Sequence, residues 1–109
     1  MKNYVKEGDT LTLAAPYNVV AGAGALVGSV FGVAACDLLS TVVGEFQIEG
    51  VFDLAKASGE ITQGAKVYWD DSAKNVTTTA QSNTLIGVAE VLALTGDTTC
   101  RVYVDGAIR

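Results

Sequence analysis

Residues 45–54 read EFQIEGVFDL, and polar and apolar side chains alternate along most of this run. Phe46 and Ile48 fall on the same side of an extended chain, a step follows at Gly50, and the apolar run resumes at Val51. Alternation with a period of two is typical of a β-strand that has one buried face. The run therefore predicts a strand with an irregularity near Gly50.

Similar runs recur along the chain at short intervals. Residues 9–14 alternate in the same way before Pro16, which cannot donate to a β ladder and ends the strand. Gly28 and Gly32 predict bulges or close backbone contacts inside one long strand. Only 34–41 and 51–58 leave room for a helical turn. Further strands are expected over 18–20, 25–35, 65–69, 76–80, 84–94 and 99–104.

This spacing predicts the fold class. Strands that recur every 8–12 residues favour an all-β fold, either a single compact β-barrel or a sandwich of about eight to nine short strands. A chain of 109 residues fits one domain. We expect residues 1–8 to form an N-terminal arm and residues 9–109 to form a single β domain.

The composition limits the classes of function. Half of the residues are hydrophobic, 17% are charged, and seven Lys and Arg stand against twelve Asp and Glu. A net charge of −5 argues against nucleic acid as a partner, because phosphate binding needs a basic patch. No basic amphipathic run suits a membrane surface. The chain has no His, the commonest general base and metal ligand, so we expect no enzyme, no cofactor and no metal site.

One segment imitates a phosphate-binding loop. Residues 59–66, GEITQGAK, carry two glycines at the spacing of a P-loop. Ala65 separates the second glycine from Lys66, and Val67 stands where the magnesium-binding hydroxyl is needed. We interpret the segment as a loop that leads into a strand.

The adjacent carboxylates Asp70 and Asp71 are interpreted as part of a solvated turn. The alternative is a cation site to which Ser72 and Asn75 add ligands. In the strand just before this turn, Trp69 follows a tyrosine, so one of the two rings is expected to pack inward and the other to lie at an edge.

The cysteines and the N-terminus bear on the compartment. Cys36 and Cys100 have no metal-binding spacing, and we expect buried thiols rather than a disulfide. The charges of Lys2 and Lys6, with Glu7 close behind, leave no room for the apolar core of a secretory signal. We therefore expect synthesis in the cytoplasm.

Two pairs of short segments are similar to one another within the chain. Residues 27–34, VGSVFGVA, resemble LIGVA at 85–89, and EGDT at 7–10 resembles TGDT at 95–98. They are explained either by an internal duplication or by recurring strand and turn chemistry, and they do not indicate a solenoid.

The apolar excess predicts self-association. A domain of this size leaves part of its apolar surface exposed, and the charge-free run 10–36 is hard to bury completely. Large exposed apolar patches usually mark protein contacts.

Several segments taken together resemble a family of small phage and prophage proteins encoded among head genes, the capsid decoration or cement proteins. Members have also been labelled as phage recombinases of the RecA/RadA type, a label that the incomplete P-loop and the acidic charge contradict here. The segments that carry the resemblance are NYV at 3–5, EGDTLTL at 7–13, VGSVFGVA at 27–34, GVFDLAK at 50–56, GAKVYWD at 64–70, LIGVA at 85–89 and RVYV at 101–104.

The resemblance implies a virion structural protein that binds the major capsid protein. Such proteins add to an assembled shell, resist its expansion under DNA pressure, and commonly sit as homotrimers at local threefold positions. The family offers no catalytic motif to carry over. The implied location is the capsid surface of the virion, after synthesis in the host bacterial cytoplasm.

The N-terminal arm supplies the candidate contact residues. An extended arm can bind by adding a strand to an exposed sheet edge, whereas the alternative is a frayed terminus. A second reading of the whole chain is a β-barrel that binds a ligand or a host surface, for which exposed aromatic rings around a pocket would be the sign. The capsid-contact candidates are Lys2, Asn3, Tyr4, Val5 and Lys6.

Overall fold

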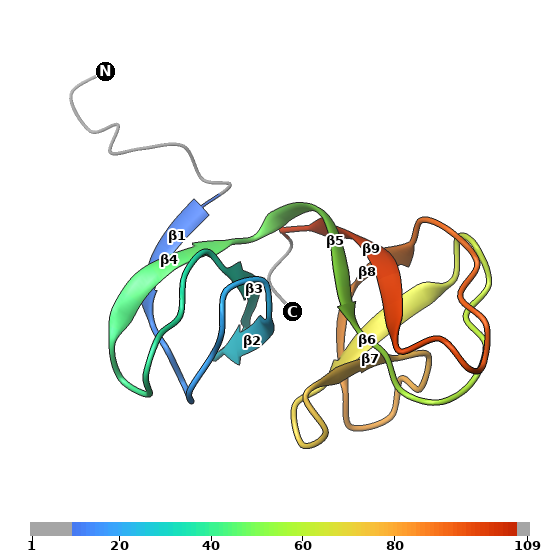
Figure 1. Ribbon diagram of the computed structural model, residues 1–109, viewed down its shortest axis with the longest axis horizontal. Helices are drawn as coiled ribbons and strands as arrows, with labels where there is room; N and C mark the ends of the chain where they lie inside the picture. The colour runs from blue at the N-terminus through green and yellow to red at the C-terminus, as the bar shows by residue number, and fades with distance from the viewer. Residues whose placement is uncertain (1–9, 107–109) are drawn as a thin grey trace.

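The computed structural model describes residues 10–106, which form nine β-strands and no helix (Figure 1). The all-β prediction is therefore confirmed. None of the elements in this part of the chain is a helix that could cross a membrane. The strands are β1 (Thr10–Ala14), β2 (Gly24–Val27), β3 (Val30–Ala34), β4 (Val43–Gln47), β5 (Glu49–Ala55), β6 (Lys66–Asp70), β7 (Asn75–Thr77), β8 (Thr84–Ala89) and β9 (Thr99–Asp105).

The strands form two antiparallel sheets that lie one after the other along the long axis of the molecule, which measures 47 Å (Figure 1). The first sheet has the order β1-β4-β3-β2 and the second the order β5-β9-β8-β6-β7. The predicted single strand over 45–54 is divided between them. Only Ile48 separates β4 from β5, so the chain passes at this residue from one sheet to the other. The expected irregularity is present at Gly50, whose φ is +137°.

The long strand expected over 25–35 is wrong, because β2 and β3 form a hairpin. Val27 pairs with Val30, which leaves Gly28 and Ser29 as a two-residue loop. Gly28 has a φ of +61°, a conformation that favours glycine, so it forms the turn and not a bulge. The close contact predicted at Gly32 is confirmed, since a Cβ there would lie 2.9 Å from the Cβ of Phe46.

Other expected strands are shorter than predicted. Residues 18–20 give a single bridge, from Val19 to Leu38, and β7 and β8 end before the predicted limits. After β8 the chain turns into a loop, in which Leu94 accepts the Asp97 N–H at its carbonyl and donates its own N–H to the Asp97 side chain. Neither 34–41 nor 51–58 contains a helical turn.

The buried side chains form two hydrophobic clusters. The smaller one belongs to the first sheet and contains Phe46. The larger one fills the second sheet, and Phe31 of β3 joins it from the first sheet. The rings of Phe31 and Trp69 have centroids 5.0 Å apart. Trp69 is buried and Tyr68 is half-buried, so the inward-packed ring predicted for this pair is Trp69.

Candidate interaction surface

The predicted contact residues Lys2, Asn3, Tyr4, Val5 and Lys6 lie outside the described residues. The described chain begins with β1, an edge strand whose ladder partner is β4. The outer side of an edge strand carries a row of backbone N–H and C=O groups that a further strand can pair with. In the sequence, residues 2–6 precede this edge strand.

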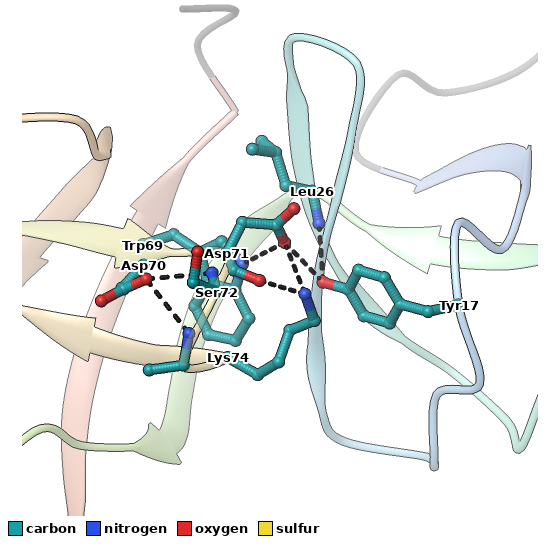
Figure 2. A network of polar contacts seen from close by, with 8 residues as sticks. Tyr17, Leu26, Trp69, Asp70, Asp71, Ser72 and Lys74 are labelled. Carbon is teal, nitrogen blue, oxygen red and sulfur yellow. Dashed lines mark hydrogen bonds and ion pairs between the residues drawn. The ribbon is translucent and has the colours of Figure 1, made fainter.

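A polar network joins the two sheets (Figure 2). Tyr17, in the loop after β1, donates its hydroxyl proton to the Asp71 carboxylate over 2.9 Å. The Trp69 indole N–H donates to the same carboxylate oxygen over 3.1 Å. The Leu26 N–H of β2 donates to the Tyr17 hydroxyl oxygen over 3.4 Å. One hydroxyl therefore links a loop and a strand of the first sheet to the β6–β7 turn of the second.

Lys74 extends this network at the surface. Its ammonium nitrogen lies 4.1 Å from the centroid of the Tyr17 ring and 3.6 Å from an Asp71 carboxylate oxygen, and it donates to the Asp71 carbonyl. Because the Lys74 and Asp71 side chains are both partly exposed, the ion pair and the contact with the ring each contribute at most about 1 kcal/mol.

The Tyr17 hydroxyl remains a donor at neutral pH. Burial, and next the hydrogen bond to Asp71, raise its pKa to about 12. Deprotonation would place two negative oxygens within hydrogen-bond distance of each other, which is unfavourable. The arrangement suits a structural contact and leaves the hydroxyl unreactive.

The two adjacent carboxylates have separate roles. Asp70 accepts the backbone N–H groups of Ser72 and Ala73 over 3.0 and 3.1 Å, the geometry of the turn that the sequence predicts. Asp71 is half-buried in the network between the sheets, which the sequence did not indicate. Within residues 10–106 no group of three His, Cys, Asp or Glu side chains is placed to hold a metal ion.

A cleft of about 460 Å³ lies beside the network. Tyr17, Val19, Val20, Trp69 and Lys74 are among its lining residues. Trp69 is only 2% exposed and Tyr17 is half-buried, so little aromatic surface is open to a ligand. The cleft therefore lacks the exposed aromatic rings that would favour the ligand-binding reading.

The segment that imitates a P-loop has the wrong geometry for one. Gly59 and Gly64 have φ values of +108° and +81° in the loop after β5, and Lys66 begins strand β6. A phosphate cradle needs a helix N-terminus after the second glycine. The interpretation as a loop leading into a strand is confirmed.

The expectation of two buried thiols holds for one cysteine. Both are free, Cys100 is buried and Cys36 is exposed. Cys36 lies just after β3 ends, where the chain leaves the core, so the expectation for it is wrong. Burial raises the pKa of the Cys100 thiol to about 11, which makes it an inert core side chain.

Most of the large exposed hydrophobic side chains in residues 10–106 lie in loops. Two apolar doublets show the pattern: Val19 and Leu38 are buried, while their neighbours Val20 and Leu39 are 64% and 68% exposed. The sequence signal for this surface is an apolar doublet in a loop, a signal that alternation alone does not reveal. The large exposed hydrophobic residues are Val20, Leu39, Val42, Val43, Val51, Val91, Leu92, Leu94 and Tyr103.

Comparison with known protein families places the chain in a family. The family described as phage cement protein matches residues 5–104. The chain belongs to the phage cement protein family. This membership gives it a structural role in stabilising phage capsids. Searches of curated proteins and of solved structures gave no match.

Proposed function

We propose that this phage cement protein binds the major capsid protein on the surface of the assembled shell as a homotrimer, and that it stabilises the shell without catalysing a reaction. The observation that carries the proposal is the family match over residues 5–104. Synthesis in the host bacterial cytoplasm precedes assembly onto the virion.

The chemistry of the surface supports this proposal. The exposed apolar side chains in the loops suit protein contacts, and the net charge of −5 disfavours nucleic acid. The hydrogen bonds that Tyr17 and Trp69 donate to Asp71 hold the two sheets together, so these side chains serve a structural contact.

The arm is the proposed capsid contact. Residues 2–6 precede the edge strand β1, and a capsid strand that pairs with the arm would continue an edge that the first sheet already offers. Deletion of residues 2–6 is expected to weaken capsid binding and to leave the thermal unfolding midpoint of the isolated protein unchanged.

Two measurements test the proposal. Light scattering over a concentration series should give three times the 11.2-kDa chain mass. Co-sedimentation should show the full-length protein bound to cognate shells, meaning shells assembled from the major capsid protein of the same phage without cement protein. Failure to bind these shells would contradict the proposed function, and binding by the 2–6 deletion as tight as by the full chain would contradict the role of the arm.

A further inference from the structure

The two sheets are built on the same plan. In the first, β1 is followed in the sheet order by β4, β3 and β2. In the second, β5 is followed by β9, β8 and β6, and only β7 is additional. Reading across each sheet, the first strand of the unit in chain order is followed by its last strand, then by the strand before the last, and then by its second strand.

Backbone hydrogen bonds occur at matching positions in both sheets. Val19 and Leu38 exchange two bonds of 2.8 and 2.7 Å between the loops of the first sheet. Ile61 and Ala93 exchange the same two bonds, of 2.9 and 2.8 Å, in the second. Further donor–acceptor pairs that correspond are Gly22–Ala34 with Gly64–Ala89, Ala23–Val20 with Ala65–Thr62, Ala34–Ala23 with Ala89–Ala65, and Ala35–Glu45 with Glu90–Arg101.

The residues at matching positions also correspond. VFGVA of β3 and LIGVA of β8 align without a gap on these bonds. Each contains a glycine where the neighbouring strand comes close: a Cβ at Gly32 would lie 2.9 Å from Phe46, and one at Gly87 would lie 1.9 Å from the Tyr103 carbonyl oxygen. Such close matching in strand order, hydrogen bonds and sequence favours duplication of one unit. The similarity between 7–10 and 95–98 does not belong to this duplication, because residues 95–98 correspond to the β3–β4 loop of the first sheet and not to 7–10.

The units differ mainly where β7 is inserted. In the second sheet β7 closes the gap between the end of β5 and β6, through a bridge from Val76 to Lys56 and pairing with β6. Among residues 10–106 no strand of the first sheet does this, and the Tyr17 side chain, in the loop after β1, reaches to the Leu26 N–H of β2. The turn that precedes β7 supplies Asp71, which binds the same tyrosine.

In each unit, the loop before the last strand forms a tip and carries an exposed leucine at the matching position. Leu39 follows Leu38, its carbonyl accepts the Val42 N–H over 3.0 Å, and it is 68% exposed. Leu94 follows Ala93, its carbonyl accepts the Asp97 N–H over 3.0 Å, and it is 54% exposed. In Figure 1 the β3–β4 loop that carries Leu39 lies at the left end and the β8–β9 loop that carries Leu94 at the right end.

We propose that Leu39 and Leu94 are two equivalent attachment points, each of which inserts into the same kind of apolar depression on neighbouring subunits of the capsid shell. This inference rests on the proposed function. A shell repeats one protein surface at regular intervals, and a duplicated chain presents one kind of tip at both ends of its 47-Å length. Two linked contacts bind more tightly than either alone, and they hold the subunits at a fixed distance.

The alternative occupant of the tips is a second copy of this chain. Contacts from tip to tip at both ends of a molecule would join copies into open chains unless the rotation between them closes a ring. A shell surface instead offers many copies of one depression to each tip. We therefore assign the tips to the shell and the contacts of the proposed homotrimer to other surfaces, and the molar mass of the tip variants tests this division.

The test compares charged and conservative variants of both tips by co-sedimentation with cognate shells. We expect Leu39→Asp and Leu94→Asp each to weaken binding about a hundredfold, because the second contact loses its effective concentration. The double variant should bind more weakly than either single variant, because only the arm is left to contact the shell. Leu39→Met and Leu94→Met should bind as the unchanged protein does. Val51→Asp is the matched control, since Val51 is 47% exposed in β5, away from both tips.

Each outcome decides a separate point. If the unchanged protein binds and either Asp variant binds equally well, the two-tip attachment is wrong and the capsid role stands. If the Asp variants lower the molar mass in solution but not the affinity for shells, the tips contact a second copy instead. If the unchanged protein does not bind cognate shells, both proposals fall.

Discussion

Tyr17 connects the two sheets through one hydroxyl group. The hydroxyl donates to Asp71 of the second sheet and accepts the Leu26 N–H of the first, while the ring lies under the Lys74 ammonium. Asp71 also accepts the Trp69 indole N–H, so removal of the tyrosine hydroxyl leaves that carboxylate with other donors. The Leu26 N–H would lose this acceptor.

Tyr17→Phe is therefore expected to lower the free energy of unfolding by about 1–2 kcal/mol at pH 7.5. Chemical denaturation monitored by tryptophan fluorescence measures this loss, and Tyr103→Phe is the control because Tyr103 is 46% exposed. Equal stability of the two variants would contradict the role of the hydroxyl.

The same substitution should change the pH dependence of stability. The folded pKa of Tyr17 is raised from 10.0 to about 12, so the folded state keeps a proton that the unfolded state releases in this range. The stabilising contribution of the hydroxyl is full below pH 10 and is lost as the pH rises toward 12. The free energies of unfolding of the unchanged protein and Tyr17→Phe should differ at pH 9.5 and be nearly equal at pH 11.5. If their difference is the same at both pH values, the assignment is wrong.

Among the elements, β7 is the inserted strand that completes the second sheet. Its central residue, Val76, is fully buried in the larger cluster and bridges to Lys56 at the end of β5. We expect Val76→Ala to lower the free energy of unfolding by about 2 kcal/mol, because it leaves a cavity in the core. Val51→Ala, at a 47% exposed position, should change it by less than about 0.5 kcal/mol. Thermal or chemical denaturation of both variants measures whether Val76→Ala loses more stability than Val51→Ala. Equal losses would mean that β7 is only loosely attached.

The strands could be predicted from alternation, but their partition into sheets could not. Phe46 and Leu54 continue one apolar face in the sequence, yet they lie in different sheets, because strand partners far apart in the chain decide the pairing. The hairpin at Gly28 and Ser29 was missed although a glycine followed by a serine is a known two-residue turn signal. The loop tips were missed because either residue of an apolar doublet can be the buried one. The Val19–Leu38 and Ile61–Ala93 bridges decide which one is buried, and the sequence does not show these bridges.

The whole molecule consists of two related units whose loop tips lie at opposite ends of a 47-Å axis (Figure 1). One polar network and the Phe31–Trp69 contact hold these units together. A rigid connection between two ends is what a protein needs in order to resist the separation of shell subunits. On this proposal the molecule as a whole resists the separation of shell subunits, while the arm and the loop tips attach it to the shell.

Calorimetry of cognate shells with and without the protein would show whether the protein stabilises the capsid. We expect the full-length chain to raise the temperature at which the shells disrupt, and we expect this rise to reach a plateau once the binding positions are filled. An unchanged disruption temperature, measured on shells that co-sedimentation shows to be saturated with the protein, would contradict the role in capsid stabilisation.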